Sequence, residues 1–240
     1  MSDNEQTITA TQEKTAYIVP GIGYTTDRSL LYFSGKLAEK AGYTRKPIHF
    51  GGFEKGVKGD EEKMKRAFRH AYNQLIDQLP ENQSGKQTDK SRADHVSDNT
   101  IASNQAEESQ NLFISKSIGT AVSLRADRRL GLHSKHILFT PLQETMYELK
   151  LLLEAQGSNR ANDIIIFHGL NDPWAPDNEL ISSEAEECSV TLCQITEANH
   201  SLETGNVLTD IGNLRSVLEE VAEFLNTDTA ENYIADCKKT

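Results

Sequence analysis

One unbroken apolar run constrains the fold more than any other part of this sequence. Residues 163–167 read Asp-Ile-Ile-Ile-Phe, with a polar residue on either side. A strand without polar alternation is typical of a parallel sheet whose two faces are both covered. Parallel strands need long crossover connections, which are usually helices. The run therefore predicts an α/β domain with a mostly parallel β-sheet flanked by helices.

The rest of the chain alternates between short apolar runs and segments with helical periodicity. Further strands are expected at residues 16–19, 46–50, 112–114, 136–140 and 190–195. A first helix should begin after a cap at Thr26 or Asp27. The other helices are expected over residues 61–79, 119–130, 146–153, 178–187 and 207–225. This alternation predicts a single α/β domain over residues 15–226.

Three segments are too polar to belong to a packed core. They are a disordered tail at 1–14, a flexible insertion at 80–110 and a polar C-terminal tail at 227–240. Such compositions bury too little apolar surface to offset the entropy of ordering. The insertion enters the sheet at the amino end of the strand at 112–114. We therefore expect the insertion to lie away from the carboxyl ends of the strands.

The charge of the chain disfavours two kinds of partner. A formal net charge of −11 opposes binding to nucleic-acid backbones and anionic membranes. No stretch approaches the roughly 20 apolar residues that span a bilayer, and the N-terminus does not read as a signal peptide. Cys188, Cys193 and Cys237 fit no metal spacing, and a reduced pair at 188 and 193 is favoured over a disulfide. We expect a cytoplasmic protein, whose oligomeric state stays open.

A turn rich in small residues follows the predicted strand at 112–114. Residues 115–119 read Ser-Lys-Ser-Ile-Gly and lead into a predicted helix. A nucleophile elbow needs this context, because the sharp turn exposes the serine Oγ and tolerates only small neighbours. Against the pattern G-x-S-x-G, Ser117 is the candidate nucleophile and Ser115 replaces the first glycine. An ordinary strand-to-helix turn is the alternative interpretation.

Two more chemical groups follow the later strands of the predicted sheet. Asp172 lies in a turn after the run at 163–167, and His200 lies in a loop after the strand at 190–195. The carboxyl ends of parallel strands share the edge of the sheet at which ligands bind. An aspartate in a turn and a lone histidine are each common for structural reasons. Together with Ser117, in the order serine, acid, histidine, they predict a catalytic triad.

In these motifs the chain resembles the α/β-hydrolases, nearest to small dienelactone-hydrolase-like members without a cap domain. The resemblance covers about residues 15–226 apart from the insertion, with a reduced strand set. It rests on residues 115–119, on Asn-His-Ser at 199–201, and on 169–176, which is similar to the family's G-x-x-D-x-x-x-P acid turn. It implies an α/β-hydrolase fold and a carboxylic-ester hydrolase. Only one short helix fits between the strands near 138 and 165, so the site should be open.

The triad chemistry assigns a role to each residue. Ser117 would form an acyl-enzyme, His200 would act as base and then as acid, and Asp172 would orient His200. The backbone N–H of Ile118 would be one donor of the oxyanion hole. By resemblance to the family, the second donor is the N–H of Ile22 in the loop after the first strand.

Other residues near these motifs have weaker assignments. Tyr24 and Trp174 could line the substrate pocket, although Trp174 fits a packing role equally well. His168 directly follows a buried strand, which favours a packed or supporting residue. His133 and His136 lack a third ligand, so neither a metal nor a cofactor is expected.

The sequence leaves several functions open. The substrate would be a small-molecule ester or thioester, with no nucleic-acid or membrane partner. Esterase, thioesterase, acyltransferase and peptidase activity could all use this triad. The alternative is a non-catalytic α/β-hydrolase-like protein that binds a partner, which the irregular elbow and the acidic surface favour.

Overall fold

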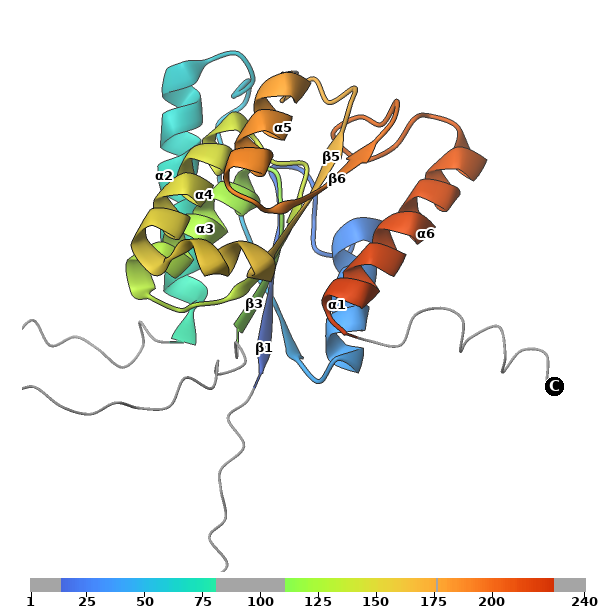
Figure 1. Cartoon of the computed structure of the whole chain (residues 1–240). Helices are drawn as coiled ribbons and strands as arrows, with labels where there is room; N and C mark the ends of the chain where they lie inside the picture. Colours follow the sequence, from blue (N-terminus) through green and yellow to red (C-terminus); the bar gives the residue numbers. More distant parts are fainter. Residues whose placement is uncertain (1–13, 81–110, 176, 227–240) are drawn as a thin grey trace, which may run out of the picture.

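The computed structural model describes residues 14–80, 111–175 and 177–226 (Figure 1). The predicted polar tails and the predicted insertion lie outside the described residues, apart from Lys14 and Pro80. Within the described part, no helix combines the length and the apolar character that crossing a membrane requires.

Six parallel strands form a single sheet in the order β2-β1-β3-β4-β5-β6. This all-parallel pairing confirms the predicted fold class. The run that predicted the sheet forms β5, which lies between β4 and β6 and is buried along its whole length. The strands are β1 (Thr15–Val19), β2 (Thr44–Pro47), β3 (Asn111–Lys116), β4 (Lys135–Phe139), β5 (Ile164–Gly169) and β6 (Thr191–Ile195).

The expected position of the second strand was wrong. It was predicted at 46–50, whereas β2 spans Thr44–Pro47 at the edge of the sheet. Pro47 pairs with Ile18 and is the last residue of the strand, a place that tolerates proline because β2 is an edge strand whose free N–H positions need no partner. The apolar residues that suggested the later position lie in the loop that follows. One of them, Ile48, is fully buried there and donates its N–H to the Ile18 carbonyl.

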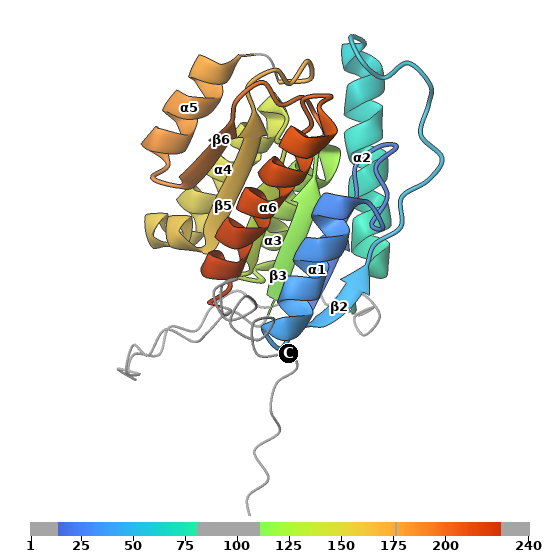
Figure 2. The same ribbon diagram turned by 90° about the vertical axis from the view of Figure 1, so that its right-hand side faces the viewer.

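Helices cover both faces of the sheet (Figure 1). α1 (Ser29–Lys40) and α6 (Val207–Phe224) lie side by side on one face, as Figure 2 shows. The helices of the other face are α2 (Glu61–Gln78), α3 (Ile118–Leu130), α4 (Gln143–Gln156) and α5 (Asn178–Glu187). The connection from β4 to β5 contains only α4 and the short 3-10 helix η2 (Ser158–Asp163). No cap domain interrupts the sheet at that point.

The predicted cap of the first helix was also wrong. Arg28, not Thr26 or Asp27, is the N-cap residue of α1, and its side chain caps nothing. A backbone turn from Thr25 to Arg28 precedes the helix, and Thr26 and Asp27 are the two central residues of that turn. The Tyr24 hydroxyl accepts a hydrogen bond from the Leu30 N–H at 3.4 Å, which serves one of the free donors of the first turn.

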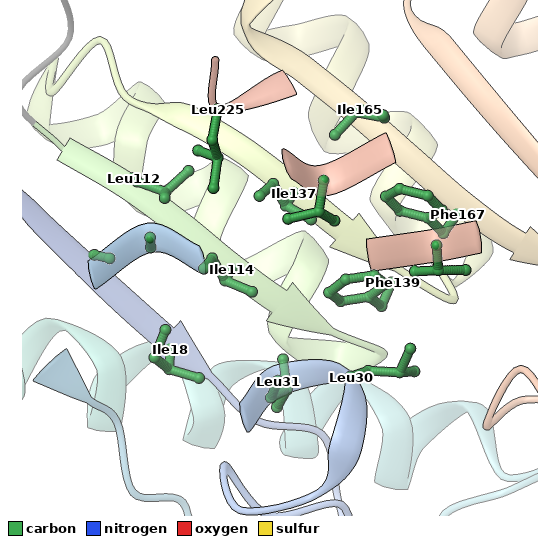
Figure 3. Close-up of a cluster of buried hydrophobic side chains, with 14 of the residues drawn as sticks. Ile18, Leu30, Leu31, Leu112, Ile114, Ile137, Phe139, Ile165, Phe167 and Leu225 are labelled. Atoms are coloured by element: carbon green, nitrogen blue, oxygen red, sulfur yellow. The ribbon is translucent and has the colours of Figure 1, made fainter. Parts of the chain in front are cut away.

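The core follows the alternation of side chains along each strand. In β3, Leu112 and Ile114 face α1 and α6, whereas Phe113 faces α2 and α3. Figure 3 shows the first of these clusters, in which strand residues meet Leu30 and Leu31 of α1. Because both faces are covered, the loops at the carboxyl ends of the strands remain the place for a site.

Candidate active site

Ser117 occupies a strained turn between β3 and α3. Its backbone has φ 55° and ψ −126°, a region that non-glycine residues rarely adopt. Its N–H donates to the Phe139 carbonyl of β4 at 3.0 Å, which fixes the turn to the sheet. Strain of this kind costs about 1–3 kcal/mol and persists only where the surroundings impose it. The turn therefore has the geometry of a nucleophile elbow.

The small residues around Ser117 have a clear steric cause. A Cβ on Gly119 would lie 2.6 Å from the Pro20 carbonyl oxygen, and one on Gly21 would lie 3.0 Å from Ser117 Cβ. The first approach would be a clash with backbone, and the second would crowd the side chain of Ser117. The loop after β1 thus packs directly on the elbow, which brings the predicted second oxyanion loop beside Ser117.

Ser115 fits the position at which a glycine is usual. Its side chain is fully buried, and its Oγ lies 3.0 Å from Ser123 Oγ of α3. The Ser123 hydroxyl in turn donates to the Thr120 carbonyl at 3.0 Å. Because both hydroxyls have partners, the replacement buries no unsatisfied polar group.

Asp172 and His200 come together at the carboxyl edge of the sheet. His200 Nδ1 lies 2.7 Å from Asp172 Oδ2, and the Trp174 N–H donates to Asp172 Oδ1 at 2.9 Å. The Asp172 side chain is fully buried, whereas that of His200 is 20% exposed. The loops that carry them are in close contact, because a Cβ on Gly169 would lie 2.4 Å from the Ala198 carbonyl oxygen.

The charge state of this pair follows from its surroundings. Burial alone would raise the pKa of Asp172, but the hydrogen bond and charge of His200 and the Trp174 N–H lower it below its usual value. Burial lowers the pKa of His200, the charges of Lys116 and Lys58 add to this, and Asp172 opposes it. At neutral pH a neutral His200 therefore donates from Nδ1–H to ionised Asp172, which leaves Nε2 free to accept a proton.

Ser117 and His200 lie on neighbouring loops but are not hydrogen-bonded to each other in this structure. The connection between their loops runs through Lys116, whose Nζ donates to the His200 carbonyl oxygen at 2.6 Å. Catalytic hydrogen bonds are often long in unliganded enzymes and tighten with substrate. The structure thus pairs Asp172 with His200 by a hydrogen bond, and Ser117 lies on the adjoining elbow without a hydrogen bond to His200.

The two predicted oxyanion donors belong to the two segments that meet at the elbow. Ile118 is the first residue of α3, and Ile22 lies in a tight turn closed by hydrogen bonds between the backbones of Gly21 and Tyr24. Within the described part of the chain, neither N–H is hydrogen-bonded to another group. Neither N–H is therefore committed to another protein group within these ranges.

The residues with weaker assignments lie around this edge. The Trp174 and His200 ring centroids are 5.7 Å apart, and Lys58 Nζ lies 5.2 Å from the Trp174 centroid. Tyr24 lies with its ring against Lys116. His168 is buried, with Nε2 2.7 Å from Asn178 Oδ1, as expected of a supporting residue.

The histidines excluded as metal ligands belong to another part of the fold. His136 is buried near the amino end of β4, where its Nε2 lies 2.7 Å from Asp127 Oδ2. Across the described ranges, no group of three or more His, Cys, Asp or Glu residues could hold a metal ion. Cys188 and Cys193 are both free thiols.

Sequence reasoning passed over Lys116 and Thr140. Lys116 Nζ donates to Thr140 Oγ1 at 2.9 Å, and both side chains are buried. The available signal was a lysine at the end of a strand that is otherwise apolar and buried. A charge in such a place is rare unless it has a defined partner.

No protein-family model matches the chain, and no curated protein matches it in sequence. Solved structures do match it. A protein of unknown function from Agrobacterium tumefaciens, described as a candidate α/β-hydrolase, superposes with a TM-score of 0.53 at 16% identity, over 91% of this chain and 86% of the other. A candidate hydrolase of the α/β superfamily from Xanthomonas campestris pv. campestris superposes with a TM-score of 0.52 at 15% identity. The match covers 89% of this chain and 99% of the other.

A third similar structure is a protein from Thermoplasma acidophilum described as a predicted CIB-like hydrolase. It gives a TM-score of 0.55 at 13% identity, over 91% of this chain and 89% of the other. At these identities the likeness concerns the fold alone.

Proposed function

We propose that this chain, whose fold is that of the α/β-hydrolases without a cap domain, is a serine hydrolase. The observation that carries the proposal is the backbone of Ser117, held at φ 55° between a strand and a helix. Strain of this kind is found at functional sites, and here it presents a hydroxyl at the edge at which such folds bind ligands. More specifically, we propose a carboxylic-ester hydrolase that acts through an acyl-enzyme on Ser117.

The first half of the reaction forms the acyl-enzyme. Ser117 Oγ attacks the ester carbonyl carbon while its proton passes to His200 Nε2. The carbonyl oxygen becomes an oxyanion, and the C–O bond to the alcohol then breaks. His200 gives the proton to the leaving oxygen, so that the alcohol departs neutral. In the second half, water takes the place of Ser117, and the products are a carboxylic acid and the free enzyme.

The surroundings of His200 support this role. Asp172 accepts from Nδ1 and stabilises the imidazolium that forms during each half of the reaction. Ile118 and Ile22 supply backbone N–H groups for the oxyanion, and one such donor typically contributes roughly 3 kcal/mol to transition-state stabilisation.

The open edge of the sheet suggests the kind of substrate. Because α4 and η2 alone connect β4 to β5, no cap encloses the acyl group. We propose a small-molecule ester or thioester, and not a nucleic acid or a membrane, in keeping with a net charge of −11. We place the reaction in the cytoplasm on the same compositional grounds. A thioesterase, a peptidase or an acyltransferase would use the same residues.

One observation favours a second candidate. The missing hydrogen bond between Ser117 and His200 suits an α/β-hydrolase-like protein that binds a partner without catalysis. A fluorophosphonate separates the two candidates, since it reacts only with an activated serine.

The test is labelling of the purified protein by a fluorophosphonate, followed by hydrolysis of p-nitrophenyl esters of increasing chain length. We expect stoichiometric labelling that Ser117→Ala abolishes, and ester hydrolysis lost in the same variant. A folded wild-type protein that stays unlabelled would support the binding protein instead.

A further inference from the structure

A buried lysine connects the strand ends around the candidate site. Lys116 is the last residue of β3 and directly precedes Ser117. It is 1% exposed, and its Nζ donates to Thr140 Oγ1 at 2.9 Å and to the His200 carbonyl oxygen at 2.6 Å. The centroid of the Tyr24 ring lies 4.6 Å from the same nitrogen. Lys116 thus contacts the loops that follow β1, β4 and β6.

The fold gains little from a charge in this place. An ammonium group loses its hydration on burial, and only excellent partners offset that loss. Lys116 forms no ion pair with a carboxylate in the described part of the chain, and burial lowers its pKa to about 7. The neutral amine still has N–H groups for both oxygen acceptors, so the two hydrogen bonds do not depend on the charge.

A second sign of strain lies at the other end of this contact. Thr140, the residue after β4, has φ 46°, which is an outlier for a β-branched residue. Its N–H donates to the Phe167 carbonyl at 2.8 Å, and its hydroxyl accepts from Lys116. Backbone strain tends to persist where a site requires a side chain in a fixed place. Ser117 and Thr140, two of the residues with positive φ at this edge, therefore both adjoin Lys116: one follows it in the chain and the other accepts its hydrogen bond.

We infer that Lys116 is a positioning residue, which acts on the reaction by holding the His200 backbone at a fixed separation from Ser117. This inference rests on the proposed function. Because Lys116 precedes the nucleophile in the chain, the strand that presents Ser117 also tethers the loop that presents the base. The loop itself is folded around Asn199, whose side chain accepts from the Ser201 N–H at 2.7 Å. The hydrogen bond from Lys116 connects this folded loop to the elbow.

The charged groups around Lys116 have a smaller effect on the site. Asp172 and Glu203 attract its ammonium group, and Tyr24 offers its ring face. When Lys116 is charged, it and Lys58 disfavour protonation of His200. Removing the charge would raise the pKa of His200, so the acidic limb of the rate profile would move to higher pH.

The test compares Lys116→Met with Lys116→Gln. Methionine keeps the length and shape of the side chain without a donor, whereas glutamine keeps an N–H. The readouts are the second-order rate constant of fluorophosphonate labelling, kcat and KM for the best p-nitrophenyl ester, and Tm. Lys150→Met is the matched control, since Lys150 pairs with Glu184 and Glu187 on the surface.

We expect Lys116→Met to slow labelling and kcat by about 100-fold with KM nearly constant, because a small misplacement of a catalytic group has effects of this size. Its Tm should be unchanged or higher, since a buried ammonium group has been removed. Lys116→Gln should recover about tenfold over Lys116→Met, and Lys150→Met should match the wild type.

Three results would overturn the inference. The first is labelling of folded Lys116→Met within about threefold of the wild-type rate. The second is equal slowing in both variants with an equal fall in Tm. The third is that Lys116→Met does not fold while Lys116→Gln is fully active, since Lys116 would then be needed for the fold and not for the site. If the wild type itself is not labelled, the proposed function fails first, and the two failures are thereby distinguished.

Discussion

The proposed reaction requires opposite charge states of two neighbouring side chains in the site. Asp172 must stay ionised although it is buried, and it does so because His200 and the Trp174 N–H lower its pKa. His200 must stay neutral beside that carboxylate, and burial lowers its pKa enough to achieve this. The pair therefore holds a base in its neutral form and a carboxylate in its charged form at the same pH.

This arrangement predicts the pH dependence of the reaction. The pKa of His200 lies below its usual value of 6.5, and only the neutral ring can take the Ser117 proton. The rate should therefore be high at neutral pH and fall as pH decreases through that lowered pKa, with the acidic limb below pH 6.5. The measurement is kcat/KM, or the rate of fluorophosphonate labelling, as a function of pH. An acidic limb clearly above this value would contradict the assignment of His200 as a buried base.

Ser115 illustrates how a departure from a motif is absorbed. The glycine of the usual elbow pattern leaves room between strand and helix, and here the Ser115 hydroxyl fills that room and meets Ser123 of α3. Ser123 is itself a small polar residue eight positions later in the chain. The elbow thus keeps its geometry with a different pair of residues at the contact.

At the scale of elements, glycines set how closely the loops of the site approach one another. Gly169 ends β5, and its missing side chain lets the Ala198 and Asn199 carbonyls come near the strand. Those carbonyls belong to the loop that carries His200. The separation of β5 from this loop therefore decides where the base lies.

Gly169→Ala should lower activity strongly while the sheet stays intact. Its Cβ would meet the Ala198 oxygen at 2.4 Å, and the loop must move away to relieve the clash. We expect labelling to slow by about 100-fold, because the imidazole moves with the loop. The measurement is the labelling rate together with Tm.

Gly212→Ala is the matched control for this change. Gly212 lies within α6 with open space around it, so alanine should add about 0.5–1 kcal/mol of stability and leave the rate unchanged. Equal rates in the two variants would show that the His200 loop tolerates displacement.

Much of the fold was predictable because it rests on local patterns. The run at 163–167 indicated a sheet buried on both faces. The placement of Ser117, Asp172 and His200 at one edge of the sheet followed from their positions after predicted strands. The hydrogen bonds of Lys116 were not predictable, because its two acceptors lie 24 and 84 residues further along the chain. The position of β2 was missed because an edge strand ended by proline has little apolar pattern.

At the scale of the whole molecule, the candidate site and the start of β3 lie at opposite edges of the sheet. Asn111 begins β3, so residues 81–110 join the sheet at its amino edge, whereas Ser117 lies just after the carboxyl end of the same strand. All six strands are parallel, so every strand begins at the amino edge and ends at the edge that carries the site. The point at which this segment joins β3 is therefore separated from Ser117 by the length of the strand.

Deleting residues 83–108 should leave the chemistry intact. We expect labelling and kcat within about twofold of the wild type, since no residue of the candidate site is removed. The closure entropy of a shorter connection from α2 to β3 should add about 1 kcal/mol of stability, so Tm should stay constant or rise. The measurements are kcat, labelling and thermal unfolding of the deleted chain. A large fall in kcat at constant Tm would mean that this segment reaches the carboxyl edge and takes part in binding or catalysis there.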